Sequence, residues 1–245
     1  MATREDYFDR RGASYDRDAV HHRIVSFLMN GLDLLQGSTV LDIATGTGMA
    51  ALEAAPRVGP AGNVIGIDVS EGMLRQARHK AIAAGLSNVQ FMHSDAERLD
   101  LPAAQFDFVV CASALVLMSD VAGALRHWVT FLKAGGVLAF ETPAKPFGLS
   151  QRAVEVAARR GIHLAYGEVA DTQGKCQVLL SGAGLEVLSV RIEFADTATV
   201  PVQAALEFWD QRVDHPAWAP IKDATASERQ VMRDDFNSKR RSGCY

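Results

Sequence analysis

The sequence predicts an α/β fold in which a doubly wound, mostly parallel sheet carries a helical cap. Three observations support this prediction. Short apolar runs typical of buried strands alternate with helical patterns between residues 39 and 142. A glycine-rich turn, residues 45–48, directly follows the first of these runs, and an acidic residue, Asp68, ends the second. Strict alternation of strand and helix predicts parallel pairing with right-handed crossovers.

The composition is that of a globular protein with a sizeable core, because about half of the 245 residues are apolar. No run of 18 apolar residues occurs, so no membrane span is expected. The net charge of −4 gives no basic footprint for nucleic acid. Three widely separated cysteines favour neither a disulfide framework nor a metal site. We therefore expect a cytoplasmic protein without a metal, and a homodimer is left open.

The first part of the chain, residues 1–36, is expected to form a polar arm and a lid helix. Ile24, Phe27 and Leu28 fall at helical spacing, which predicts the helix at about 19–36. Ser70 is a candidate cap for a later helix that ends near Gly85. Further helices are expected at about 47–57 and 120–133, and strands at about 39–44, 64–68, 88–93, 106–111 and 137–142.

The pattern changes after Pro143, where a substrate-side insert is expected at about 143–170. Helices are predicted at about 150–160, 172–181, 202–214 and 224–238, and a strand at 186–194. A last antiparallel strand, which only the family resemblance given below implies, is not identified: segment 194–200 supplies it, or it is degenerate or absent. The chain is thus divided into residues 1–36, a sheet domain at 37–200 and a C-terminal helical segment at 201–245.

The glycine turn and the acid after it predict a ligand site. Glycines at residues 46 and 48 let the backbone approach a ligand closely, and the helix that they open directs free N–H groups toward it. Asp68, at the end of the next strand, is placed to bind two ribose hydroxyls. An adenosine-type cofactor is therefore expected across the carboxyl ends of two neighbouring strands.

Asp42 distinguishes between two classes of such cofactors. It lies just before the turn, where a carboxylate repels a pyrophosphate but suits a cationic ligand. The ammonium and sulfonium groups of S-adenosylmethionine fit that requirement. The alternative is that Asp42 is a strand-end acid on the surface.

Residues 37–142 resemble a class I S-adenosylmethionine-dependent methyltransferase. Asp42-Ile43-Ala44-Thr45-Gly46-Thr47-Gly48 is especially similar to the ubiquinone/menaquinone C-methyltransferase-like branch, although the broader family often has glycine in place of Ala44. Residues 94–97 and 106–112 match in order and spacing, and so does Leu132-Lys133-Ala134-Gly135-Gly136, in which Ala134 replaces a proline. The resemblance implies a Rossmann-like fold and S-adenosylmethionine as the cofactor.

The resemblance also implies which residues bind that cofactor. The methionine part would be bound by Asp42, Ala44 and Gly46, with Gly48 allowing close approach; the ribose by Asp68; the adenine by Val69, Met73, Asp95 and Ala96; and the sulfur would lie over Cys111 or Ala112. Two of these positions have an alternative role, since Met73 and Cys111 could simply belong to the core.

Two residues are candidates for a catalytic role, because any general base should lie near the transferred methyl group. In this branch a Tyr-Asp pair in the arm lies over the cofactor, and the matching pair here is Tyr15-Asp16. The alternative for Tyr15 is a hydrophobic contact that fixes the first helix. His22 is the second candidate, because it begins the helix next to the arm.

The acceptor is expected to be hydrophobic or aromatic, such as a quinone precursor, a polyketide or an indole-like metabolite. This expectation rests on apolar and aromatic residues after the fourth strand and in the later segments, namely Val116, Leu117, Met118, Phe147, Leu149, Ile162, Leu164, Tyr166, Phe208, Trp209 and Trp218. The alternative is that the residues of the later segments only pack the cap helices onto the domain.

The sequence therefore predicts methyl transfer from S-adenosylmethionine to a small organic acceptor, with C-methylation favoured over O- or N-methylation. One alternative is a protein of the same fold that binds the cofactor without transferring methyl, as a regulator or a cyclase. The cofactor residues do not separate this alternative, because binding and turnover share them. An NAD-dependent dehydrogenase is the other alternative, and Asp42 and Asp95 count against it.

Overall fold

A computed structural model describes residues 3–144, 146, 148–164, 167–193 and 202–238. Its contacts group the chain into two compact units. The sheet unit comprises Met1–Thr142 and Thr172–Val190, and the helical unit comprises Pro143–Asp171 and Arg191–Tyr245. The three-part division made from the sequence stays a prediction.

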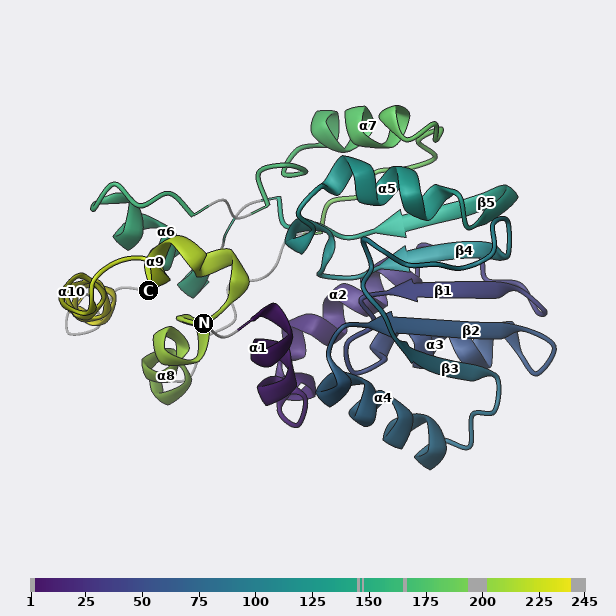
Figure 1. The fold of residues 1–245 in the computed structure, drawn as a ribbon, viewed down its shortest axis with the longest axis horizontal. Helices are drawn as coiled ribbons and strands as arrows, with labels where there is room; N and C mark the ends of the chain where they lie inside the picture. The colour runs from purple at the N-terminus through teal and green to yellow at the C-terminus, as the bar shows by residue number, and fades with distance from the viewer. Residues whose placement is uncertain (1–2, 145, 147, 165–166, 194–201, 239–245) are drawn as a thin grey trace. The chain divides into compact units, whose positions relative to one another are not determined.

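The sheet unit is built on five parallel strands in the order β3-β2-β1-β4-β5 (Figure 1). Their bounds are Thr39–Ile43 for β1, Asn63–Asp68 for β2, Val89–His93 for β3, Phe106–Cys111 for β4 and Leu132–Phe140 for β5. The strand order reverses at β1, which confirms the doubly wound, Rossmann-like sheet. In such sheets a ligand crevice forms beyond the carboxyl ends of the strands at the reversal point.

Helices cover both faces of the sheet and bury two apolar clusters. One cluster joins Leu125 and Trp128 to inward-facing residues of β1, β2 and β4, and the other joins Val40, Val64 and Val110 to the alanines of α3. The helices of the sheet unit are α1 Arg4–Arg11, α2 Ala19–Met29, α3 Met49–Val58, α4 Glu71–Ala83, α5 Val121–Val129 and α7 Gln173–Gly182. Neighbouring residues along a strand therefore point into opposite clusters, because successive side chains of a strand lie on opposite faces of the sheet.

The N-terminal region differs from the expected arm and long helix. Residues 4–11 form α1, which begins with a capping box: the Thr3 hydroxyl accepts from the Asp6 amide, and the Asp6 carboxylate accepts from the Thr3 amide. The next helix, α2, ends at Met29 and not near residue 36. The Arg57 guanidinium donates to the Met29 carbonyl at 2.7 Å, which satisfies a helix-end acceptor through a tertiary contact.

The later part of the sheet also differs from the prediction. Strand β5 begins at Leu132, five residues before the expected start. The strand predicted at 186–194 is wrong over the described residues 186–193, which carry no strand, while Phe194 and segment 194–200 lie outside the described residues. Leu188 and Ile192 are 75% and 63% exposed. Within the described residues this segment neither pairs with β5, the edge strand of the sheet, nor buries its apolar side chains.

The helical unit has its own aromatic core. It contains α6 Gly148–Ala158, α8 Val202–Arg212, α9 Ala219–Lys222 and α10 Ala226–Ser238. The rings of Trp209 and Trp218 lie 5.2 Å apart, and Phe208 stacks on Phe236 at 5.9 Å. No helix in the part of the chain that the structure describes is long and apolar enough to cross a membrane.

This core corrects part of the predicted acceptor lining. Leu164, Trp209 and Trp218 are only 2–3% exposed and pack among α6, α8 and α10. Leu149, Ile162 and Phe208 pack against the same cluster. The structure thus gives these six residues a packing role within the helical unit, and the packing of the cap helices onto the sheet domain, which was the alternative, stays a prediction. Phe147 and Tyr166 lie outside the described residues.

Candidate functional site

The glycine turn between β1 and α3 adopts a left-handed backbone at three positions. The φ angles are 52° at Ala44, 56° at Gly46 and 83° at Gly48. A left-handed alanine costs roughly 1–2 kcal/mol, and such strain concentrates at ligand sites. The Thr45 amide donates to the Ile67 carbonyl at 2.8 Å, which ties the turn to β2. The turn is therefore held in a conformation that its own sequence only partly favours.

Gly48 serves packing more than ligand approach. A Cβ atom added to Gly48 would lie 2.9 Å from Cβ of Ala77 and 2.9 Å from Cζ of Phe91, whereas one added to Gly46 would meet nothing within 4 Å. The missing side chain of Gly48 thus lets α3 pack closely against α4 and β3.

A pair of alanine substitutions separates this packing role from backbone strain. Gly46→Ala is expected to lower the free energy of unfolding by about 1–2 kcal/mol, the cost of a left-handed alanine. Gly48→Ala is expected to cost a further ~1–3 kcal/mol, because the new methyl group overpacks Ala77 and Phe91. Denaturant unfolding of the ligand-free protein measures both, and equal losses would contradict the packing role.

Asp42 lies beneath the turn and is only 1% exposed, so it is not a surface acid. Its Oδ2 accepts from the Thr45 hydroxyl at 2.5 Å and from the Ala51 amide at 3.0 Å. Burial raises the pKa of Asp42 to about 7, against the opposing effect of these two hydrogen bonds. Asp42 therefore places a titratable group directly behind the turn.

Asp68 joins the two sides of the crevice. Its Oδ2 accepts from the Gly46 amide at 2.8 Å, and its Oδ1 accepts from the Ser70 amide at 2.8 Å. Burial raises the pKa of Asp68 above its ordinary value, although these amides favour the ionised form. One carboxylate thus ties the glycine turn to the start of α4.

A cavity opens at the carboxyl ends of the strands, and most of the predicted cofactor residues line it. Those that do are Ala44, Gly46, Asp68, Val69, Met73, Asp95 and Ala96. Asp42, Gly48 and Cys111 do not line it and are buried. The lining offers small residues along the turn and a carboxylate at each of two strand ends, which fits an adenosine ligand with ribose hydroxyls and an amino group.

The loop after β3 is held in place by side chains on both sides. The Ala96 carbonyl accepts from the Trp128 indole at 2.8 Å. Glu97 accepts from the Ser119 hydroxyl at 2.6 Å and from the Asp120 amide at 3.0 Å. These hydrogen bonds lower the pKa of Glu97 although partial burial opposes them. The Asp95 carboxylate is therefore presented to the cavity from a fixed loop.

The wall after β4 is apolar and has one strained polar position. Ala112, Ala114, Leu117 and Met118 line the cavity together with Ser113. Ser113 has a φ of 57°, and its amide donates to the Glu141 carboxylate at 3.2 Å. Burial raises the pKa of Glu141.

Cys111 is a core residue in this structure. It is 1% exposed, and burial raises the pKa of its thiol far above the ordinary value, with nearby Asp42 adding to the effect. A thiol that stays protonated is a poor nucleophile. The neighbouring Ala112, which the sequence left as the other candidate beneath the sulfur, is the residue that reaches the cavity.

The N-terminal segment supplies the remaining wall. Arg4, Phe8 and Tyr15 line the cavity. The Tyr15 ring meets His21 edge-on at 4.2 Å and lies beneath the Arg11 guanidinium at 5.3 Å. His22 does not line the cavity: its side chain is exposed, and Nε2 donates to the Asp16 carbonyl at 2.9 Å.

Sequence reasoning missed Arg4, Phe8, Ser113 and Ala114 as cavity residues. The residues Thr3 to Asp6 fit a helix-capping pattern, which would have placed α1, and with it Arg4 and Phe8, in an ordered helix. Ser113 carried no comparable signal, because its left-handed backbone and its hydrogen bond to Glu141, just after β5, are not readable from the local sequence.

Comparisons with known proteins agree with this geometry. Residues 40–136 match the methyltransferase domain family. The chain is 36% identical over 138 residues to aklanonic acid methyltransferase DauC of Streptomyces sp. strain C5, covering 56% of this chain and 63% of the relative. It is 33% identical over 148 residues to demethylmenaquinone methyltransferase of Listeria monocytogenes serotype 4a, covering 57% of this chain and 61% of the relative. These matches span less than two thirds of either relative.

A solved structure extends the likeness in fold. The YcgJ protein of Bacillus subtilis aligns with a TM-score of 0.58 at 22% identity, over 86% of this chain and 88% of that one. At this identity the likeness shows the fold alone.

Proposed function

We propose that this protein, which carries a class I S-adenosylmethionine-dependent methyltransferase domain of the quinone C-methyltransferase-like branch, methylates a small hydrophobic or aromatic acceptor. The observation that carries the proposal is the cavity in which Asp68 and the left-handed Ala44–Gly46 turn face an apolar wall. When bound, the cofactor supplies a methyl group activated by a positively charged sulfur. The protein then has to align the acceptor with the methyl group, exclude water and remove a proton from the acceptor where the reaction requires it.

In this proposal, different residues around the cavity bind different parts of the cofactor. Asp68 would accept from the ribose hydroxyls, and Asp95 from the adenine amino group, while the Ala96 amide would donate to the ring. Val69 and Met73 would pack against the adenine faces. The backbone at Ala44 and Gly46 would hold the methionine part, and ionised Asp42 would favour its positive charges from behind the turn.

The acceptor would lie against the apolar wall after β4. Ala112, Leu117 and Met118 offer a surface without charged groups, which suits a flat apolar molecule. The two curated relatives are named for demethylmenaquinone and aklanonic acid, which supports an acceptor of that kind. The branch resemblance favours carbon as the atom that is methylated.

Tyr15 is proposed to orient the acceptor or take its proton, because it is the one of the two predicted catalytic residues that lines the cavity. Tyr15→Phe is expected to lower kcat by about 100-fold, within the usual range for one acid–base group, and to leave cofactor affinity within a few-fold. His22→Ala is the matched control and should retain wild-type kcat.

The direct test uses S-adenosylmethionine with an isotopically labelled methyl group. The protein is incubated with reduced naphthoquinones and, separately, with polycyclic aromatic acids, and products are detected by mass spectrometry. The expected result is one labelled methyl group on an acceptor, at a carbon position by NMR. Cofactor binding without labelled product from either class would contradict the proposed activity.

A further inference from the structure

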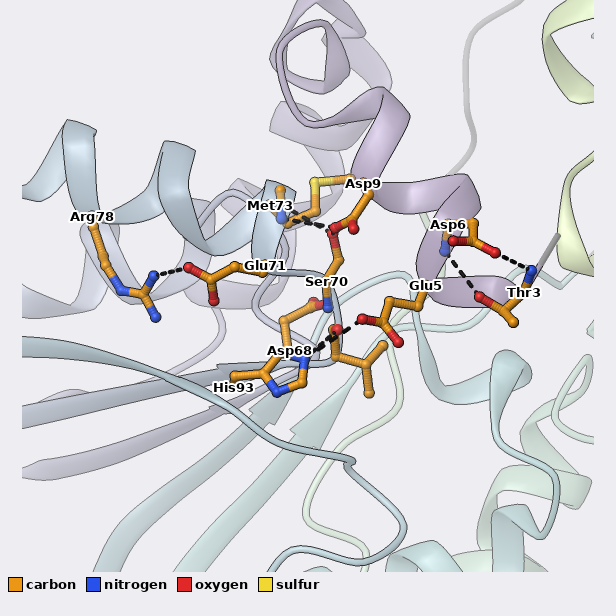
Figure 2. Close-up of polar contacts among 12 residues, drawn as sticks. Thr3, Glu5, Asp6, Asp9, Asp68, Ser70, Glu71, Met73, Arg78 and His93 are labelled. Carbon is orange, nitrogen blue, oxygen red and sulfur yellow. Dashed lines mark hydrogen bonds and ion pairs between the residues drawn. The ribbon is translucent and has the colours of Figure 1, made fainter.

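The N-terminal clasp, defined here as residues 4–17, reaches the start of α4 through one carboxylate. Figure 2 shows Asp9 of α1 directed at the first turn of that helix, beside Ser70. Asp9 Oδ1 accepts from the Ser70 hydroxyl at 2.6 Å and from the Gly72 amide at 2.7 Å. A residue far away in sequence therefore helps to cap α4.

The Asp9 carboxylate complements Ser70 at the start of α4, because the Ser70 hydroxyl accepts from only one of the backbone amides that lack a partner inside the helix. The Ser70 oxygen accepts from the Met73 amide at 3.1 Å, as a helix cap usually does. The Gly72 amide is another of the amides without a partner inside the helix, and Asp9 accepts from it. The negative charge of Asp9 also interacts favourably with the positive end of the helix dipole.

The clasp and α4 approach each other backbone to backbone. A Cβ atom added to Gly72 would lie 2.7 Å from the Asp9 carbonyl oxygen, and one added to Gly12 would lie 2.7 Å from the Gly72 carbonyl oxygen. These two glycines allow the close approach that brings Asp9 within hydrogen-bond distance. The contact is therefore a fitted one and not a chance surface pair.

The same contact continues into the cavity. Asp9 binds Ser70, the Ser70 amide donates to Asp68, and Asp68 accepts from the Gly46 amide of the glycine turn. This is one continuous series of hydrogen bonds from α1 to the turn. Arg4, a clasp residue, also lines the cavity directly.

A second anchor fixes the other end of the clasp. Asp16 accepts from the Lys80 ammonium of α4 at 2.5 Å and from the hydroxyl of Thr47 in the glycine turn. The clasp is thus attached to both sides of the cavity, at α4 and at the turn. Because the clasp residues Arg4, Phe8 and Tyr15 line the cavity, a ligand there would lie against the clasp.

We propose that Asp9 is a positioning residue for the cofactor site, which holds Ser70 and thereby the ribose-binding Asp68 and keeps the clasp closed over the cavity. This inference rests on the proposed function only in that the ligand is S-adenosylmethionine or its product. Loss of Asp9 weakens both the closed clasp and the site beneath it. The rate at which the product leaves therefore reports on Asp9 without any acceptor.

The test measures dissociation of S-adenosylhomocysteine from the full-length protein by surface plasmon resonance. Asp9→Ala is expected to raise the dissociation rate at least about tenfold, because hydrogen bonds to a charged group are among the stronger ones. Asp9→Asn keeps an acceptor oxygen and should give a smaller increase. Glu71→Gln is the matched control: it removes a negative charge from the same helix turn, where Glu71 pairs with Arg78 at 2.5 Å, and should change the rate less than twofold.

Hydrogen exchange distinguishes opening of the clasp from a general loss of stability, because a general loss would not affect residues 4–17 selectively. S-adenosylhomocysteine should slow exchange in residues 4–17 of the wild type and of Glu71→Gln, and this protection should be lost selectively in Asp9→Ala. If Asp9→Ala does not fold, Asp9→Asn carries both measurements. Wild-type dissociation rates and protection in the Asp9 variants would overturn the inference alone, whereas a wild type that does not bind the product would overturn the proposed function as well.

Discussion

Replacing Asp68 by alanine is expected to weaken S-adenosylmethionine binding by at least about 100-fold. Two ribose hydroxyls would each lose a hydrogen bond to a charged acceptor, worth roughly 1.5–3 kcal/mol apiece. The Gly46 and Ser70 amides would also lose their partner, so both sides of the cavity would lose a tie. Isothermal titration calorimetry of the wild type and the variant measures the ratio of affinities.

Two further variants make this result specific. Asp68→Asn keeps one acceptor oxygen and should fall between the wild type and the alanine variant. Asp107→Asn is the control, because Asp107 accepts from the Thr39 amide at 2.8 Å and from Lys133 at 2.9 Å at the opposite end of the strands. An affinity loss in Asp107→Asn as large as that in Asp68→Ala would contradict the assigned role.

The second large effect is the pH dependence that Asp42 gives to stability. Its pKa is about 7 in the folded protein and 3.8 as the ordinary value. Between these pH values the folded state holds a proton that the unfolded state has released, so stability falls as pH rises through this window. The full cost, on the order of 4 kcal/mol, applies above pH ~7.

Asp42→Asn should remove this part of the pH dependence in the ligand-free protein. Its free energy of unfolding, relative to the wild type, is expected to increase by several kcal/mol between about pH 4 and pH 8. The pKa of Asp68 is raised as well, so the difference between the two proteins is the quantity to measure. Parallel pH profiles from denaturant unfolding would contradict the assignment to Asp42.

The same variant should weaken cofactor binding, although it stabilises the ligand-free protein relative to the wild type as pH rises. A cationic ligand favours ionised Asp42, so wild-type affinity for S-adenosylmethionine should rise between about pH 6 and pH 8, with release of a proton. Asp42→Asn should bind more weakly and with a flatter pH profile. Calorimetry in two buffers of different ionisation enthalpy counts the protons released. Equal proton release by both proteins would contradict this linkage.

The sheet and its glycine turn could be predicted from the sequence because their signals are local. Apolar runs, a helix cap at Ser70 and paired glycines each specify a short segment without reference to its neighbours. The end of α2 could not be predicted in this way, since Arg57 closes it from another helix. The strand expected at 186–194 is absent over the described residues 186–193, where Leu188 and Ile192 are not buried against the sheet, and burial is a tertiary property that the local pattern does not contain.

The candidate site was predictable where a motif sits at a strand end, as at Asp68 and Asp95, which both line the cavity. It was not predictable where the deciding contact is tertiary. Asp9 and Ser70 are 61 residues apart, and no sequence pattern links them. The place of Trp209 and Trp218 could not be predicted either, because the sequence does not distinguish an aromatic side chain that lines a binding pocket from one that is buried in a core.

The most direct measurement is calorimetric titration of the purified wild type with S-adenosylmethionine, S-adenosylhomocysteine and NAD. The cavity around Asp68 and the Ala44–Gly46 turn predicts micromolar binding of both sulfur compounds and none of NAD. Binding of NAD, or no binding of either sulfur compound, would contradict the assignment of this cavity to S-adenosylmethionine.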